Sequence, residues 1–186
     1  MSTNPFSLQG KTGIVTGLAN ADSIAYGCAR AMHEAGAELL LTYGNAKADK
    51  YVLPLAAELG NAEALLCDVQ DETQVAALFE RAASRWGKLD FLIHSMAFAL
   101  KDDLHGRVVD CSRDGFALAM DISCHSFIRL AKRAEPLLKE GGTLITLSYY
   151  GAEKVVDNYN MMGPVKAALE ASVRYLAAEL GPQGIR

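Results

Sequence analysis

The sequence contains few of the features that would place the chain in a membrane, in a secretory route or on nucleic acid. None of the apolar runs in its 186 residues approaches the length that spans a membrane. Residues 1–5 lack the basic segment and apolar stretch of a secretory signal peptide. The net charge is −4 and no basic block is present, which argues against a nucleic-acid partner.

Cysteine is scarce and widely scattered. The four cysteines are Cys28, Cys67, Cys111 and Cys124, and they form neither a Cys-x-x-Cys motif nor a Cys/His spacing typical of a metal site. We therefore expect reduced thiols, a cytoplasmic protein and no structural metal. Repeats, low-complexity segments and internal linkers are also absent, so we expect one domain over residues 1–186.

Short apolar runs alternate with helical patterns along the chain. The predicted strands cover residues 12–17, 38–43, 62–67, 89–94 and 143–147, and the predicted helices cover 23–32, 47–59, 71–86, 112–139 and 161–180. Strands that are apolar throughout, rather than at every second residue, are typical of a parallel sheet with helices on both faces. The sequence therefore predicts an α/β fold with a doubly wound parallel sheet, of the Rossmann type.

Four local features qualify this pattern. Thr73 is expected to cap the third predicted helix, and Pro164 is expected to lie in the first turn of the last one. Residues 101–110 are the one irregular stretch and are predicted to form a surface loop. The two glycines at 141–142 are expected to end the long 112–139 helix.

Residues suited to ligand binding follow several predicted strands. Ligands of doubly wound sheets bind at the carboxyl ends of the strands, where Gly17, Asp68 and Ser95 lie. Gly17 would let the backbone approach a pyrophosphate, and Ser23 opens the next helix, whose amides favour an anion. Because the full Gly-x-Gly-x-x-Gly pattern is absent, Gly17 fits a plain β–α turn equally well. Asp68 fits either an acceptor for an adenine amino group or a helix cap, and His94 is interpreted as a hydrogen-bonded histidine at a strand end.

The segment after the fifth predicted strand carries two tyrosines and a lysine, Tyr149, Tyr159 and Lys166. A tyrosine can donate a proton or a hydrogen bond to a developing oxyanion, and a nearby ammonium aids that donation and can hold sugar hydroxyls. Tyr159 and Lys166 are seven residues apart, about two helical turns, so they can share one helix face. The same spacing is also typical of an ordinary core tyrosine beside a solvated lysine.

Several short motifs occur together in this chain. They are residues 16–19 with 23–27, 36–39 with 42–43, 67–69, 94–99, 121–123, 147–149, 151–153, and 158–160 with 162–163 and Lys166. Together they resemble the short-chain dehydrogenase/reductase superfamily, and within it the bacterial NAD(P)H-dependent enoyl-acyl-carrier-protein reductases. The resemblance covers residues 8–186, and the Tyr-x6-Lys spacing is specific, because typical superfamily members have Tyr-x3-Lys.

The resemblance implies an activity and a set of site residues. It implies hydride transfer from a nicotinamide to the β-carbon of a trans-2-enoyl thioester on acyl-carrier protein, in fatty-acid elongation. In that reading Tyr159 faces the substrate carbonyl, Tyr149 and Ala99 border the acyl substrate, and Lys166 bonds the nicotinamide ribose. The residues implied to line the dinucleotide are Gly17, Ser23, Ile24, Asp68, Val69, Ser95, Met96 and Lys166.

NADH is predicted over NADPH, which stays as the alternative. A 2′-phosphate usually requires an arginine or a lysine cluster beyond the second strand. Residues 43–47 contain one lysine, Lys47, and no arginine, and Gly44 stands where the family often has a longer polar residue. No acidic residue lies there to repel a phosphate, so we expect a modest preference.

The resemblance also implies a homotetramer and a longer chain. The segments 116–131 and 161–180 are apolar nearly all round, and superfamily members pair these helices across a two-fold axis. Family chains continue past Arg186 with a sixth strand, a mobile substrate loop and a seventh strand, so this chain is expected to lack the C-terminal strands and parts of both sites. Two other functions stay open: a short-chain reductase acting on a ketone, against which the Tyr-x6-Lys spacing argues, and a non-catalytic dinucleotide-binding fragment.

Overall fold

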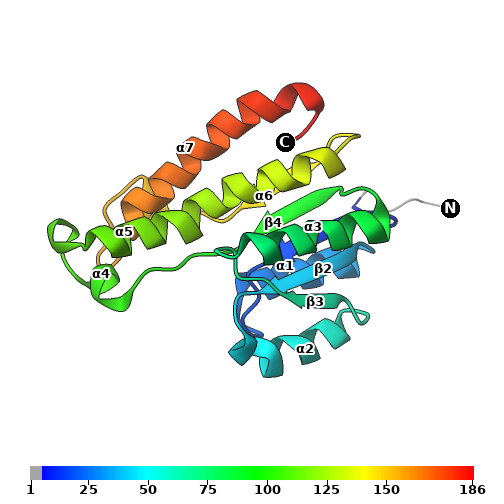
Figure 1. Ribbon diagram of the computed structural model, residues 1–186, viewed down its shortest axis with the longest axis horizontal. Coiled ribbons are helices and arrows are strands. Elements are labelled where there is room, and N and C mark those ends of the chain that lie inside the picture. The colour runs from blue at the N-terminus through cyan, green and yellow to red at the C-terminus, as the bar shows by residue number, and fades with distance from the viewer. Residues whose placement is uncertain (1–5) are drawn as a thin grey trace.

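A five-stranded parallel sheet with helices on both faces forms the molecule in the computed structural model, which describes residues 6–186 (Figure 1). The prediction that residues 1–5 do not form a signal peptide concerns residues outside this range. The strand order is β3-β2-β1-β4-β5, and all four neighbouring pairs are parallel. This is the order expected of a Rossmann-type sheet, so the predicted doubly wound fold is confirmed.

The strands differ in how deeply they are buried. Their bounds are Thr12–Thr16 for β1, Glu38–Tyr43 for β2, Glu63–Leu66 for β3, Phe91–His94 for β4 and Thr143–Thr146 for β5. Every residue of β1 and β4 is buried, whereas β5 at the edge has no buried residue. The other edge strand, β3, has no buried residue either, so the sheet has a buried centre and two more exposed edges.

Apart from α4, the helices lie within or close to the predicted helical segments. Their bounds are Ile24–Glu34 for α1, Asp49–Glu58 for α2, Glu72–Trp86 for α3, Lys101–His105 for α4, Arg113–Met120 for α5, Ser126–Ala134 for α6 and Met162–Leu180 for α7. Pro164 lies in the first turn of α7 as predicted, where its missing N–H costs no helical hydrogen bond. No helix in residues 6–186 has the length and apolar character needed to cross a membrane.

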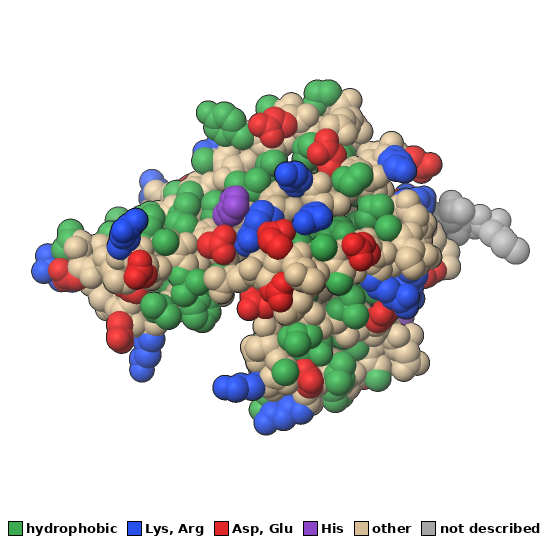
Figure 2. All heavy atoms as spheres, viewed as in Figure 1, with side chains coloured by type: hydrophobic (Ala, Val, Ile, Leu, Met, Phe, Trp, Pro, Cys, Tyr) green, Lys and Arg blue, Asp and Glu red, His purple; other side chains and the backbone are tan. Residues whose placement is uncertain are grey.

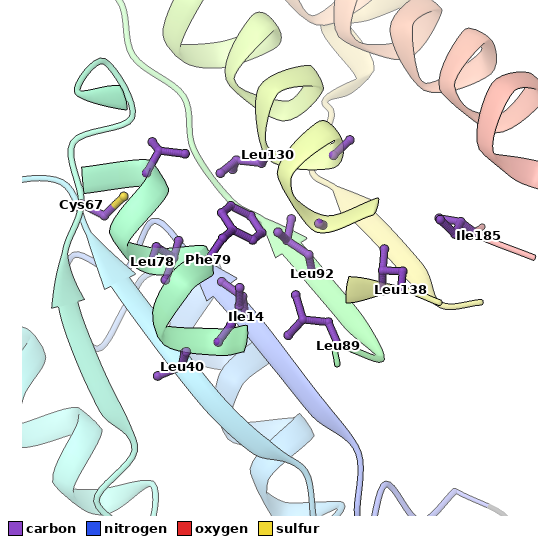
Figure 3. Close-up of a cluster of buried hydrophobic side chains, with 14 of the residues drawn as sticks. Ile14, Leu40, Cys67, Leu78, Phe79, Leu89, Leu92, Leu130, Leu138 and Ile185 are labelled. Carbon is purple, nitrogen blue, oxygen red and sulfur yellow. The ribbon is translucent and has the colours of Figure 1, made fainter. Parts of the chain in front are cut away.

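Two apolar layers hold the helices against the sheet. On one face, α1 and α2 pack on a cluster that includes Val15, Leu41 and Ile93. On the other face, α3 and α6 pack on a cluster in which Phe79 of α3 points toward Leu92 of β4 (Figure 3). Neighbouring residues of one strand thus pack into opposite layers, because successive side chains of a strand point to opposite faces of the sheet. This explains why the central strands are apolar throughout.

Three local predictions need correction. The N-cap of α3 is Asp71, not Thr73, because the Asp71 carboxylate accepts from the amides of Thr73 (2.8 Å) and Gln74 (3.3 Å). Residues 101–110 are not a loop, since they form α4 and a 3₁₀ turn over Val108–Asp110. The long 112–139 helix is not regular, because the π-helical segment Asp121–His125 separates α5 from α6 and a 3₁₀ turn closes it at Leu137.

The last residues of the chain run beside the edge strand. Ile185 forms a parallel bridge with Gly142, just before β5. The amide of Arg186 donates to the Gly142 carbonyl at 2.8 Å, and the amide of Leu144 donates to the Arg186 carbonyl at 2.6 Å. These contacts extend the parallel ladder by one step beyond β5.

Candidate active site

A pocket of about 400 Å³ lies at the carboxyl ends of β4 and β5. It is lined by Ile24, Ser95, Met96, Ala97, Leu147, Ser148, Tyr149, Val156, Asp157, Asn158, Tyr159 and Lys166. In Figure 1 the strands point toward the left side of the molecule. On that side, Figure 2 shows a hollow between the projection that carries α4 and α5 and the part that carries α2. The pocket therefore lies at the sheet end where doubly wound folds bind ligands.

Tyr149 and Tyr159 contact each other in this pocket. Their ring centroids are 4.6 Å apart and their planes are inclined by 59°. Tyr149 is 48% exposed, whereas Tyr159 is partly buried. Burial, and to a lesser degree the Tyr149 phenol, raise the pKa of Tyr159 above its usual 10.0. The Tyr159 phenol therefore stays protonated near neutral pH and can donate a hydrogen bond into the pocket.

Lys166 supplies a buried ammonium beside these rings. It lies in the second turn of α7, and its Nζ donates to the Leu147 carbonyl at 2.7 Å, at the end of β5. An ammonium has three donors, so this bond leaves others for a ligand. Burial lowers the pKa of Lys166 from its usual 10.5, while Cys124 opposes that shift. The spacing of Tyr159 and Lys166 thus places both in one pocket, which excludes the reading of Lys166 as a solvated lysine.

Gly17 lies against Ser95 and Met96, two residues that line the pocket. Its φ is +88°, a conformation that side chains other than glycine rarely adopt. A Cβ at this position would collide with the Ser95 carbonyl and crowd the Met96 side chain. The turn after β1 therefore packs directly against the backbone after β4, and only glycine permits this approach.

Ser23 and Asp68 organise turns at the same end of the sheet. Ser23 caps α1, since its hydroxyl accepts from the Tyr26 amide at 3.4 Å and donates to the Asn20 carbonyl at 2.7 Å. Asp68 is not the cap of α3; its Oδ1 accepts from the Gln70 amide at 3.0 Å within the turn before the helix. The amides at the start of α1 still point toward the carboxyl ends of the strands, where they favour an anion.

His94 is a fully buried residue with both ring nitrogens engaged, as predicted. The Ser126 hydroxyl donates to the Ile122 carbonyl at 2.6 Å, so it accepts from His94 Nε2 at 2.8 Å. His94 Nδ1 then accepts from the Thr146 hydroxyl at 2.8 Å. Burial, with the Lys166 charge as a second cause, lowers the pKa of His94 to about 3. The ring is neutral at pH 7 and joins β4, β5 and α6.

The pocket unites about half of the predicted site residues. Ile24, Ser95, Met96, Tyr149, Tyr159 and Lys166 line it. Gly17, Ser23, Asp68, Val69 and Ala99 lie outside its lining. Ala99 packs against the apolar cluster that also contacts Tyr159. The lining residues that were not among the predicted site residues are Ala97, Leu147, Ser148, Val156, Asp157 and Asn158, and each lies next to, or within three residues of, one that was.

A family model and curated relatives both match this chain to enoyl-acyl-carrier-protein reductases. The family model described as "Enoyl-(Acyl carrier protein) reductase" matches residues 17–186. The chain is 52% identical over 179 residues to an enoyl-[acyl-carrier-protein] reductase [NADH] of Rhizobium meliloti, covering 96% of this chain and 66% of the relative. It is 50% identical over 183 residues to a Nostoc enoyl-[acyl-carrier-protein] reductase [NADH], covering 97% of this chain and 71% of that one.

Solved structures of the same kind superpose closely. The enoyl-(acyl-carrier-protein) reductase of Anaplasma phagocytophilum, in complex with NAD, matches with a TM-score of 0.94 and 50% identity over 100% of this chain and 71% of that one. The Bacillus cereus reductase, with NADP⁺ and indole naphthyridinone, matches with a TM-score of 0.93 and 48% identity over 96% and 70%. The chain thus spans about two thirds of the length of the relatives that it matches.

Proposed function

The chain belongs to the enoyl-acyl-carrier-protein reductase family, within the short-chain dehydrogenases/reductases, and from that membership we propose that it reduces the carbon–carbon double bond of a trans-2-enoyl thioester, with NADH as the reductant. The thioester is carried by acyl-carrier protein, as the names of the relatives indicate for them. The reaction is a step of fatty-acid elongation. The five strands and their helices would act as one dinucleotide-binding and catalytic domain.

One observation carries this proposal: Tyr149, Tyr159 and Lys166 line a single pocket at the carboxyl ends of β4 and β5. The Tyr159 phenol is a protonated donor and the Lys166 ammonium has donors to spare. A donor and a cation held beside a partly apolar pocket suit a substrate whose oxygen gains negative charge during the reaction.

The residues along the carboxyl ends fit a dinucleotide. Gly17 leaves its backbone open where a side chain would collide with Ser95, and the α1 amides behind Ser23 suit a pyrophosphate. Ile24 is 64% exposed at the pocket rim, where an aromatic ring can cover it. The residues proposed to hold the cofactor are Gly17, Ser23, Ile24, Asp68, Val69, Ser95, Met96 and Lys166. When bound, the reduced nicotinamide supplies the hydride.

Tyr159 is assigned to the thioester oxygen. As the β-carbon accepts a hydride, an enolate forms and negative charge develops on that oxygen. The raised pKa of Tyr159 keeps its hydroxyl protonated, so it can donate to this oxygen and, in a later step, supply a proton. Tyr149, in ring contact with Tyr159, is assigned to position the substrate. Ala99 is assigned to border the acyl group.

Lys166 is assigned to the nicotinamide ribose and to a nearby positive charge. Its bond to the Leu147 carbonyl fixes the ammonium at the end of β5. The remaining donors suit ribose hydroxyls. The positive charge also favours the enolate over the neutral thioester, because the site is partly excluded from water.

Turnover of a crotonyl thioester tests the proposal. The purified protein is mixed with NADH and the crotonyl thioester of acyl-carrier protein, and loss of the reduced-nicotinamide absorbance is followed. The expected result is oxidation of one NADH for each double bond reduced. A protein that binds NADH without oxidising it would support the non-catalytic alternative, and a protein that oxidises NADH only with a ketone would support the other reductase.

A homotetramer is the proposed assembly. Exposed apolar side chains support it on two helices, with Phe116 of α5 at 40% exposure and Val173 and Tyr175 of α7 at 37% and 74%. Figure 2 shows hydrophobic side chains at the surface over α7. Light scattering at micromolar concentration is expected to give four times the chain mass, and a monomeric mass would contradict the assignment. The cytoplasmic location stays a prediction from the four free cysteines.

A further inference from the structure

Tyr159 lies between two asparagines whose backbones adopt the left-handed conformation. The φ angles are +64° at Asn158 and +41° at Asn160. Residues other than glycine seldom occupy this region, and asparagine is among those that tolerate it best. The two asparagines turn the chain sharply on either side of Tyr159, just before α7 begins at Met162. The direction of the phenol therefore depends on a turn that few residue types can form.

The side chain of Asn160 fixes this turn to a distant part of the chain. Its Nδ2 donates to the Leu104 carbonyl at 2.7 Å, across 56 positions of sequence. Leu104 lies in the last turn of α4, where a backbone carbonyl has no partner within the helix. The Asn160 amide thus gives the Leu104 carbonyl a hydrogen-bond partner and attaches the turn around Tyr159 to α4.

Helix α4 is itself held firmly. Asp103 is 7% exposed, and its carboxylate accepts from the Ser112 amide at 2.6 Å and from the Ser112 hydroxyl at 2.9 Å. Ser112 is the N-cap of α5. A continuous set of hydrogen bonds therefore runs from the start of α5 through α4 to Asn160.

The Tyr159 ring has little room to move. One side contacts the Tyr149 ring, and another faces Gly151, where a Cβ would collide with Tyr159 Cδ1. The backbone amide of Tyr159 donates to the Val156 carbonyl at 3.2 Å. In a slot this narrow, a small shift of the turn would displace the hydroxyl from its place in the pocket.

We propose that Asn160 is a positioning residue for Tyr159, acting through its hydrogen bond to the Leu104 carbonyl and its left-handed backbone. The proposal rests on the proposed role of Tyr159 as the donor to the substrate oxygen. Asn160 does not line the pocket that holds Tyr149 and Lys166, and the proposal assigns its effect on the reaction to the tyrosine.

Three substitutions at Asn160 separate its two contributions. Asn160→Gly keeps the backbone conformation and loses the donor, Asn160→Asp keeps the size and loses the donor, and Asn160→Ala loses both. Displacing a catalytic group by about 1 Å can cost on the order of 10²-fold in rate. We expect kcat to fall about ten- to a hundredfold in all three, most in Asn160→Ala, with the KM for NADH unchanged.

Asn61 offers a matched control for backbone strain. Within residues 6–186 it is a third asparagine with a left-handed backbone, with φ +58°, and it lies in the turn before β3, outside the pocket lining. Asn61→Ala is expected to lower Tm as Asn160→Ala does and to leave kcat unchanged. If Asn160→Gly and Asn160→Asp both turn over at the wild-type rate, the positioning role is refuted while the proposed function stands.

A double substitution tests whether Asn160 acts through the phenol. In a Tyr159→Phe background, Asn160→Ala is expected to cause no further loss of kcat, because the group that it positions is gone. An additional tenfold loss there would show a general structural role and overturn the proposal.

Fluorine NMR gives a readout that does not depend on turnover. With 3-fluorotyrosine incorporated, the Tyr159 resonance is identified by its absence in Tyr159→Phe. Asn160→Ala is expected to shift or broaden this resonance, because the ring moves relative to Tyr149, and Asn61→Ala is expected to leave it in place. An unchanged resonance in Asn160→Ala would overturn the proposal even if the protein reduces no enoyl thioester.

Discussion

The centre of the sheet and its edge beside β5 are built in different ways. Every residue of β1 and β4 is buried, and their ends meet through Gly17 and the Ser95 carbonyl with no room for a side chain. At the edge, β5 has no buried residue, and the segment after it turns through two left-handed asparagines to present Tyr159. The pocket thus lies just beyond a buried sheet, while its proposed chemical groups come from the segment after β5 and from the start of α7, an arrangement common in enzymes, where a rigid scaffold positions functional groups outside it.

This difference predicts different consequences of substitution. Changes in the buried centre remove packing or leave buried polar groups unpaired, so they should reduce the free energy of unfolding. Changes in the half-exposed segment after β5 remove few buried contacts, so they should reduce kcat with little effect on stability unless they strain its left-handed backbone, as Asn160→Ala does. The predictions that follow test this division, from the largest expected effect to the smallest.

Tyr159→Phe should give the largest loss of kcat without a matching loss of stability. Loss of one oxyanion donor typically costs about 3–4 kcal/mol, or on the order of 10²–10³ in rate. We expect kcat to fall by this factor, with NADH binding and Tm close to those of the wild type. Tyr149→Phe should do less, because its hydroxyl is assigned to positioning. Near-normal turnover by Tyr159→Phe, with none by Tyr149→Phe, would mean that the two roles are reversed.

Lys166 joins the two regions, since it lies on α7 and bonds the carbonyl at the end of β5. Lys166→Ala should lower kcat and also weaken NADH binding, because ribose contacts are lost. The pKa of Lys166 is lowered by burial, so the wild type should lose NADH affinity as pH rises through that lowered pKa and the ammonium becomes neutral. Lys166→Arg keeps its charge to higher pH. An alkaline loss of affinity that is the same in both proteins would contradict the assignment.

Gly17→Ala tests the close contact between the turn after β1 and the backbone after β4. The φ of +88° and the collision with the Ser95 carbonyl both oppose a Cβ. Left-handed strain alone costs on the order of 1–3 kcal/mol, so urea unfolding should show a loss of at least this size together with weaker NADH binding. Gly27→Ala is the matched control: this exposed helical glycine has open space around its Cβ position, so alanine there should stabilise by about 0.5–1 kcal/mol.

His94 should make the centre sensitive to acid. Its pKa in the folded protein is lowered from 6.5 to about 3, so between these values the unfolded chain binds a proton that the folded chain does not. Stability then falls as pH falls through this window, by about 1.4 kcal/mol per pH unit from this residue. His94→Gln lacks the titrating group, so its unfolding free energy should fall less steeply with acid. Parallel slopes in urea titrations would show that His94 does not contribute.

The choice between NADH and NADPH should be the smallest effect. The turn after β2 has Lys47 and no arginine, and Gly44 there is exposed. We expect a preference for NADH in kcat/KM that is modest, because no acidic side chain lies at residues 43–47 to repel a 2′-phosphate. A preference for NADPH of a hundredfold or more, equivalent to about 2.7 kcal/mol, would refute the prediction.

The sequence alone determined the elements whose signals are local. Apolar runs separated by helical periodicity predicted the five strands and the doubly wound layout, because a strand inside such a sheet must be apolar on both faces. The family resemblance likewise assigned Tyr149, Tyr159 and Lys166 to one site, and the structure brings them into one pocket. The irregular 101–110 stretch, by contrast, was wrongly predicted to be a loop.

Only the tertiary structure decided the features that depend on partners far away in sequence. Helix α4 has five residues, too few for a helical pattern to be read, and it is stabilised by Asp103 bonding to Ser112. The hydrogen bonds of His94 to Ser126 and Thr146 span 32 and 52 positions, and that of Asn160 to Leu104 spans 56. Such bonds form only when the fold brings the two groups together, so no local sequence pattern predicts them.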